Sequence, residues 1–159
     1  MELEEILQII NSDEFINVEE NWQNIDLTKL EEKRKTSDLK KSGVYALYNE
    51  NYGFIYVGKA KKIYDRLKSH NEATKGNEKA DCWREFFMAI TGNIVGYWYP
   101  LESKNNAQKE ESARQILERL IQIKYEPIFD KIYPRGKRVS RPDINEVLER
   151  YRKKRKMNE

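Results

Sequence analysis

Three short stretches of the chain are rich in branched and aromatic residues, a composition typical of β-strands. They span residues 44–48, 54–57 and 94–99. The first two are separated by residues 49–53, where two asparagines and a glycine favour a turn. This spacing predicts an antiparallel hairpin, and the third stretch predicts a further strand that ends at Pro100.

In four other stretches, apolar residues recur at the spacing of an amphipathic helix. The expected helices cover residues 3–10, 60–70, 80–90 and 106–125. The main body then has the order strand, strand, helix, helix, strand, helix. Such an order predicts an α+β fold, in which helices flank a small, mainly antiparallel three-stranded sheet.

Composition and apolar patterning limit the class of protein. Hydrophobic residues make up 38% of the chain and charged residues 36%, against about 25% charged in an average domain. No apolar run approaches the ~20 residues that cross a bilayer, and the acidic start differs from an export signal. The single cysteine, Cys82, is expected to be a buried thiol. We therefore expect a cytoplasmic protein without a membrane segment.

Charge is distributed unevenly along the chain. Residues 1–40 carry five basic and eleven acidic side chains, whereas residues 134–159 carry ten basic and four acidic ones. This gradient indicates an acidic, helical N-terminal extension over 1–41, a central domain over 42–133 and a basic C-terminal extension over 134–159. The basic extension, with a short helix expected over 140–148, either contacts a polyanion or only aids solubility.

Five residues stand out as candidates for chemistry: Tyr45, Tyr56, Arg66, His70 and Glu118. Arg66 and His70 are four positions apart, so they lie on the same face of their helix. Glu118 lies beside the apolar stripe of its helix, where a carboxylate can reach a cleft. A guanidinium, an imidazole, a carboxylate and phenols suit metal-assisted attack on a phosphodiester.

Each candidate also has a purely structural explanation. A tyrosine on a strand usually packs in the core with its hydroxyl hydrogen-bonded. Glu118 can instead pair with Arg114 or Lys124 on its own helix. Residue types alone leave both explanations open.

The order and spacing of the candidates resemble those of a known family. Gly-Val-Tyr at 43–45 is followed, after ten residues, by Tyr-Val-Gly at 56–58. This stretch is similar to the signature of the GIY-YIG nuclease family, with valine twice in place of isoleucine. Arg66 falls at the position of the family's helix arginine. His70 falls where the family often has histidine or tyrosine.

The resemblance continues in residues 117–130, which look like the closing segment of the family's domain. Glu118 matches the metal-binding glutamate and Pro127 the usual proline. Asp130 stands where the family commonly has asparagine. The resemblance thus covers residues 43–130 and identifies 42–133 as a GIY-YIG-like nuclease domain.

The resemblance implies hydrolysis of DNA phosphodiester bonds with one Mg²⁺, or Mn²⁺ in its place, held by Glu118. Tyr45 would be the base or proton relay, with His70 taking the proton onward and Lys59 favouring the phenolate. Arg66 would stabilise the charge of the transition state.

The remaining implied roles concern contacts with the substrate. Tyr56 would orient water or phosphate, and Gly58 would leave the strand end open for close approach. The lysines expected to contact backbone phosphates are Lys59, Lys61, Lys62 and Lys68.

DNA is the expected partner, and a homodimer is plausible because cutting both strands needs two active sites or two successive nicks. Two alternatives stay open. One is a nucleic-acid-binding module that keeps the fold but has lost turnover, for which Asp130 is the only hint. The other is a nuclease that acts on RNA, whose phosphates resemble those of DNA.

Overall fold

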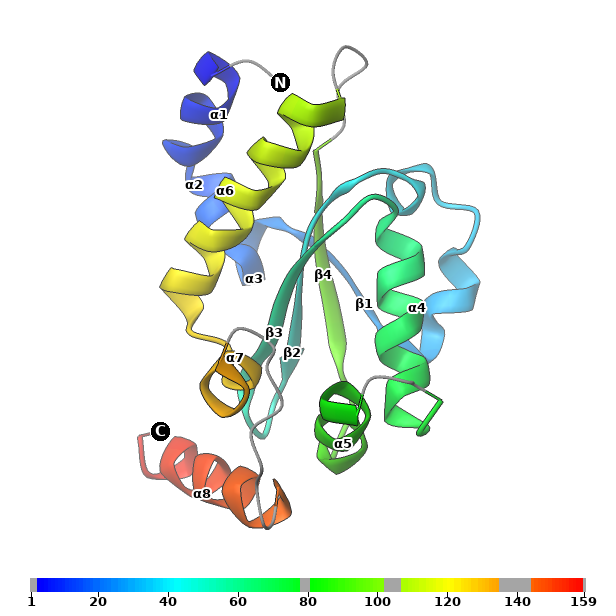
Figure 1. Cartoon of the computed structure of the whole chain (residues 1–159), viewed down its shortest axis with the longest axis vertical. Coiled ribbons are helices and arrows are strands. Elements are labelled where there is room, and N and C mark those ends of the chain that lie inside the picture. The colour runs from blue at the N-terminus through cyan, green and yellow to red at the C-terminus, as the bar shows by residue number, and fades with distance from the viewer. Residues whose placement is uncertain (1–2, 78–80, 102–106, 135–143, 159) are drawn as a thin grey trace.

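The computed structural model describes residues 3–77, 81–101, 107–134 and 144–158 (Figure 1). In chain order, the elements are α1 (Leu3–Ile10), α2 (Asp13–Ile16), α3 (Val18–Asn21), β1 (Gln23–Asp26), the 3-10 helices η1 (Leu27–Lys33) and η2 (Ser37–Lys40), β2 (Gly43–Asn49), β3 (Gly53–Ala60), α4 (Ile63–Thr74), α5 (Asp81–Ala89), β4 (Val95–Pro100), α6 (Ala107–Tyr125), α7 (Ile128–Ile132) and α8 (Ile144–Met157).

The sheet is antiparallel throughout and has the strand order β1-β4-β2-β3. The predicted hairpin of β2 and β3 is confirmed, with Tyr45 opposite Gly58. The sheet has four strands, not the three expected, because Gln23–Asp26 pairs with the outer edge of β4. This strand has only one buried residue, Ile25, so it lacks the apolar composition that marks the others.

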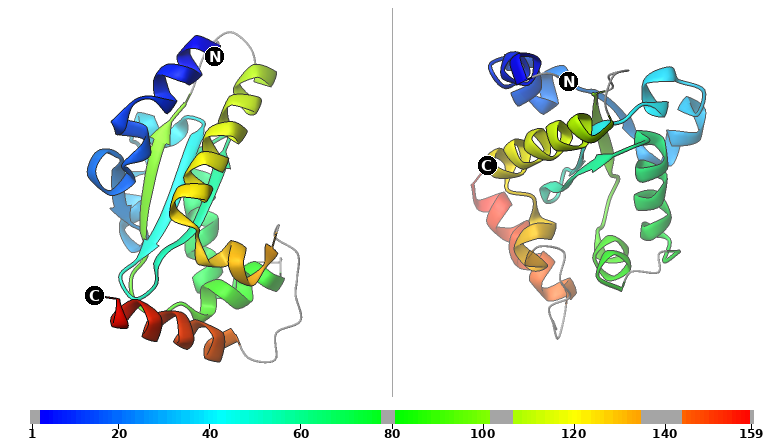
Figure 2. Two further views of the ribbon diagram at one scale, coloured as in Figure 1. Left: turned by 90° about the vertical axis from the view of Figure 1, so that its left-hand side faces the viewer. Right: turned by 45° about the horizontal axis from the view of Figure 1, so that its top comes forward.

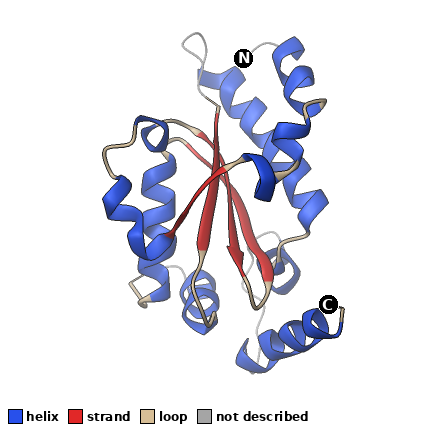
Figure 3. Ribbon diagram, turned by 180° about the vertical axis from the view of Figure 1, so that it is seen from behind, coloured by secondary structure: helices blue, strands red, loops and turns tan. Residues whose placement is uncertain are grey.

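Helices cover both faces of the sheet, as the views in Figures 2 and 3 show. Because side chains alternate between the faces of a strand, Tyr45 and Leu47 of β2 point into one hydrophobic core and Val44 and Ala46 into another. The first core lies under α4, α5 and α7. The second lies under α6 and the short N-terminal helices, which contribute Phe15.

The predicted helices are present with shifted starts. Helix α4 begins at Ile63 rather than at residue 60, because β3 continues to Ala60. Helix α6 spans Ala107–Tyr125, close to the predicted range. The predicted start of the C-terminal helix at residue 140 lies outside the described residues, and α8 is described from Ile144.

No helix among the described ranges is long and apolar enough to cross a membrane.

Candidate active site

The site is built around Tyr45, on the central strand β2. Its side chain is only 1% exposed, and its hydroxyl lies against the backbone of the neighbouring strand at Gly58. A Cβ atom at residue 58 would lie 2.5 Å from that hydroxyl and 2.9 Å from the ring of Tyr56. Gly58 therefore makes room for the two phenol rings of the protein itself. From the sequence we expected instead that Gly58 leaves this space open for the substrate.

His70 on α4 completes the buried part of the site. Its Nε2 atom is 2.7 Å from the Tyr45 hydroxyl, a hydrogen bond whose direction depends on the tautomer. Burial, aided by the positive charge of Arg66, lowers the pKa of His70 to about 3. Near neutral pH, His70, which the sequence predicts as the proton acceptor, is thus a neutral imidazole buried in the core. Burial also raises the pKa of Tyr45 well above its usual value.

Trp83 of α5 links the buried histidine to the arginine at the surface. Its ring stacks on that of His70 with 4.6 Å between centroids. The guanidinium carbon of Arg66 lies 5.8 Å from the centroid of the same ring, a cation–π contact. Helical spacing indicated only that Trp83 packs in the core. No sequence signal relates its position to the Arg66–His70 pair.

Tyr56 of β3 lies between Tyr45 and the surface. It is partly exposed, and its ring stacks on that of Tyr45 with 6.0 Å between centroids. Burial raises the pKa of Tyr56 to about 12; the charge of Arg66 acts against this rise, whereas those of Glu118 and Asp130 reinforce it. Charged groups from α4, α6 and α7 therefore act on a single phenol.

Glu118 projects from α6 at the outer edge of β3 and is partly buried. Desolvation raises the pKa of its carboxyl; the charge of Lys59 opposes the rise, and that of Asp130 adds to it. Within the described part of the chain, no cation forms an ion pair with Glu118. Arg114 binds Glu111 instead, and Lys124 donates to the carbonyl of Ile16.

The four predicted phosphate-binding lysines divide into two groups. Lys59 forms an ion pair with Glu111, whose second carboxylate oxygen accepts from Arg114 at 2.7 Å. These two cations lower the pKa of Glu111 to about 2. Lys59 is therefore committed to a carboxylate, whereas Lys61, Lys62 and Lys68 are exposed. A cleft of about 340 Å³ lies beside the site. The residues that line it are Lys59, Ala60, Lys61, Lys62, Asp65, Arg66 and Glu111.

Asp130 of α7 occupies the position where asparagine was expected from the resemblance. It is partly buried, and desolvation raises the pKa of its carboxyl, with Arg119 acting in the opposite direction. Its charge acts on both Glu118 and Tyr56. The site thus holds a second carboxyl group close to the candidate metal ligand.

The basic C-terminal extension lies at the other end of the hairpin. Arg155 of α8 donates to the hydroxyl of Tyr48 at 2.9 Å and to the carbonyl of Glu50 at 3.2 Å. Residues 135–143, which contain four of the ten basic residues, lie outside the described residues. The division into three parts with boundaries at 41/42 and 133/134, the DNA contact of the extension and the homodimer all stay predictions.

The fold places two phenols, a guanidinium and a carboxylate near one edge of the sheet. The family model of the GIY-YIG catalytic domain matches residues 41–127, more than half of the chain. The chain belongs to this family of nucleases, and its substrate class is nucleic acid. Searches of curated proteins and of solved structures found no match.

Proposed function

We propose that the protein is a metal-dependent endonuclease that hydrolyses phosphodiester bonds in DNA. The observation that supports this most directly is the convergence at Tyr56. The charges of Arg66 from α4 and Glu118 from α6 act on its hydroxyl, and Arg66 also lines the lysine-bearing cleft beside it. A backbone phosphate in that cleft would meet the cations that line it, next to the phenol on which the charge of Glu118 also acts.

The residues present suit one divalent cation, Mg²⁺ or Mn²⁺. Mg²⁺ is usually held by one or two carboxylates together with waters and substrate phosphate. Glu118 is partly buried, lacks an ion pair among the described residues and interacts with the backbone N–H of Lys59, which leaves carboxylate oxygen capacity for a metal ion. Glu111 is less suited because Lys59 and Arg114 already neutralise it. When bound, the cation would draw electron density from the phosphate and stabilise the charge that develops there.

Arg66 would stabilise the same charge from the protein side. Its planar guanidinium presents parallel donors that match two oxygens of a phosphate. The side chain is exposed at the cleft, and its contact with the Trp83 ring limits its orientations. We assign Trp83 a positioning role, acting through Arg66. Loss of such a charge-stabilising donor typically slows catalysis by ~10²-fold or more.

The two phenols would act on the attacking water. Tyr56 is the more exposed of the pair and would contact the water, while Tyr45 lies behind it. Burial raises the pKa of Tyr56 to about 12, so this phenol keeps its own proton near neutral pH and can accept a proton from the water only by passing its own proton on. With its proton on Nδ1, neutral His70 would accept the proton of Tyr45 at Nε2. Tyr45 would then accept the proton of Tyr56, and Tyr56 that of the water.

A cleavage assay with matched variants tests the proposal. Supercoiled DNA, linear DNA and an RNA of the same sequence would be incubated with the full chain in Mg²⁺, in Mn²⁺ and in EDTA. We expect nicking or cutting of DNA that EDTA abolishes. Glu118→Gln and Arg66→Gln should each cut at least ~10²-fold more slowly while still binding DNA. Glu32→Gln, which removes an exposed carboxylate of η1 that does not line the cleft, is the control and should cut normally.

Two outcomes would contradict the proposal. If Glu118→Gln cut DNA at the rate of the unchanged chain, this carboxylate would not be the metal ligand. Cutting of RNA but not of DNA would show that the substrate is RNA. Binding of DNA without any cutting in either metal ion would instead indicate a module that has lost turnover.

A further inference from the structure

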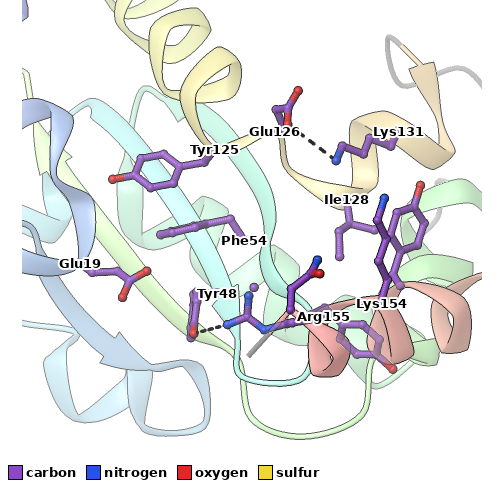
Figure 4. A pocket seen from close by; sticks show the side chains of 13 residues that line it. Glu19, Tyr48, Phe54, Tyr125, Glu126, Ile128, Lys131, Lys154 and Arg155 are labelled. Atoms are coloured by element: carbon purple, nitrogen blue, oxygen red, sulfur yellow. Dashed lines mark hydrogen bonds and ion pairs between the residues drawn. The ribbon is translucent and has the colours of Figure 1, made fainter.

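Another cavity in the described part of the chain lies away from the candidate active site. It has a volume of about 470 Å³ and is formed by the hairpin turn, the junction of α6 and α7, and helix α8 (Figure 4). This volume lies in the range of pockets that bind small molecules or parts of larger ones, about 300–1,000 Å³. We call it the α8 pocket. The proposed nuclease chemistry uses none of its lining residues.

One wall of the α8 pocket carries a guanidinium that is held by neutral groups. Arg155 lies over the ring of Tyr48, 5.7 Å from its centroid, and donates to the Tyr48 hydroxyl. Its other described hydrogen bond goes to the carbonyl of Glu50. Within the described residues no carboxylate pairs with Arg155, which is partly buried. A partly buried positive charge in such surroundings favours an anionic ligand.

Aromatic rings, two further cations and the carboxylates of Glu19 and Glu126 line the rest of the pocket. Phe54 and Tyr125 are in contact, with 4.4 Å between ring centroids, and Tyr151 of α8 also lines the cavity. Lys154 and Lys131 add two amino groups, of which Lys131 lies 4.0 Å from Glu126. Aromatic faces next to cations suit the base and the phosphate of a nucleotide.

Helix α7 joins this pocket to the candidate active site. Asp130 influences the phenol of Tyr56, whereas its neighbour Lys131 lines the α8 pocket. Along β3, Gly53 at the pocket and Lys59 at the cleft are six positions apart, a distance of about 20 Å in an extended strand. A DNA strand whose bases stay stacked as in a duplex rises about 3.4 Å per nucleotide, so about six stacked nucleotides span the same distance.

We propose that the α8 pocket binds one unpaired nucleotide of the substrate strand, about six nucleotides from the bond that is cut. The base would stack on the aromatic rings, and the adjoining phosphate would lie against Arg155 and Lys154. This inference rests on the proposed function, because it takes the nuclease substrate as the ligand. It predicts that the enzyme prefers DNA in which a duplex is joined to a single-stranded segment.

The test measures binding separately from cutting. The full chain with Glu118→Gln would be titrated, in EDTA, into dye-labelled duplexes that carry single-stranded tails of zero, three, six and nine nucleotides. We expect affinity to rise between three and six nucleotides and then level off. Lys154→Gln should remove this gain in affinity. It should also lower the slope of log affinity against log salt concentration by about one. Lys153→Gln, an equal loss of charge at an exposed position of the same helix, should keep the gain.

A second variant tests stacking. Tyr151→Leu should weaken binding of the six-nucleotide tail by at least about fivefold without changing binding of the blunt duplex. Equal affinity for all tails, or equal effects of Lys154→Gln and Lys153→Gln, would overturn the pocket proposal and leave the nuclease proposal intact. Equal competition by a free mononucleotide would show that the pocket serves a free ligand, which also overturns it. Tail-dependent binding by a chain that never cuts would overturn the nuclease proposal alone.

Discussion

The two ends of strand β3 differ in their chemistry. At the end that leads to α4, the phenols and the imidazole are packed against each other, with Tyr45 and His70 almost wholly enclosed. At the hairpin end, aromatic rings line an open cavity and the cations Lys154 and Arg155 extend into it from α8. At one end a close-packed, buried cluster lies beneath the charged groups of the surface cleft, and at the other a hollow is lined by aromatic rings, cations and two carboxylates.

This difference separates two tasks that a nuclease has to perform. Catalysis needs groups held in a fixed geometry, which close packing provides. Holding a long polyanion needs positive charge and adaptable surface, which a rigid core cannot offer. We therefore expect substitutions at the close-packed end to affect stability and rate, and those at the hairpin end to affect affinity.

Two glycines of β3 allow the sharpest test of this contrast. At Gly58 a methyl group would meet the rigid ring of Tyr45 at 2.5–2.7 Å, so Gly58→Ala should destabilise the fold by about 3 kcal/mol through overpacking. At Gly53 a methyl group would meet only the flexible end of Arg155. The main cost of a side chain there is the backbone φ of +82°, which residues other than glycine rarely adopt. Gly53→Ala should cost about 1–2 kcal/mol. Urea unfolding of both variants measures the difference.

A larger loss of stability for Gly53→Ala than for Gly58→Ala would contradict the close packing of the phenols. Gly76→Ala is a useful control, because its φ is also positive, at +83°, and its nearest neighbour is the side chain of Met88. It should behave like Gly53→Ala, since in both cases the strained backbone dominates.

The buried imidazole gives a second test, through pH. Above pH ~6.5 His70 is neutral in the folded and the unfolded chain. Between that value and its folded pKa of about 3, only the unfolded chain binds the proton. The free energy of unfolding should therefore fall as the pH is lowered, by about 2 kcal/mol between pH 7 and pH 5.

Because His70 is the single histidine of the chain, its ring resonances in an NMR titration report on it alone. They should not shift between pH 8 and pH 5. In His70→Gln, the part of the pH dependence of unfolding that belongs to this imidazole should disappear. A titration midpoint near 6.5 would show instead that the ring is open to solvent.

The smallest expected effect concerns Asp130. Its carboxylate adds negative potential at Glu118, so Asp130→Asn should raise the Mg²⁺ concentration needed for half-maximal cutting by about twofold. The same change should lower the pKa of Tyr56, because the negative charge beside the phenol is removed. Asp38→Asn, an equal change on η2, is the control. A decrease in the Mg²⁺ requirement would show that the carboxylate hinders the site.

Much of the fold could be predicted from the sequence because β2, β3 and β4 carry dense apolar and aromatic runs. Strand β1 could not, since three of its four residues are polar or charged and it pairs only at the edge of β4. The short helices α2 and α3 have four residues each, too few for a periodic pattern. Their place in the fold depends on Phe15 and Val18, which are buried beneath them.

The members of the candidate site stay a prediction, and their environment could not be predicted from the sequence. The spacing from Tyr45 to Glu118 resembles that of the family. It carried no information on burial, which lowers the pKa of His70, or on the partner of Lys59, which is Glu111. The contact of Trp83 with Arg66 likewise depends on how α5 packs against α4, which no local pattern specifies.

The position of β3 at the end of the sheet has a consequence for assembly. An uncovered outer strand can recruit a strand from another molecule and so begin aggregation. Here the side-chain amide of Gln122 on α6 donates to the Val57 carbonyl of β3 at 3.3 Å. By occupying that backbone acceptor, the helix that bears Glu118 also discourages growth of the sheet from one chain into the next.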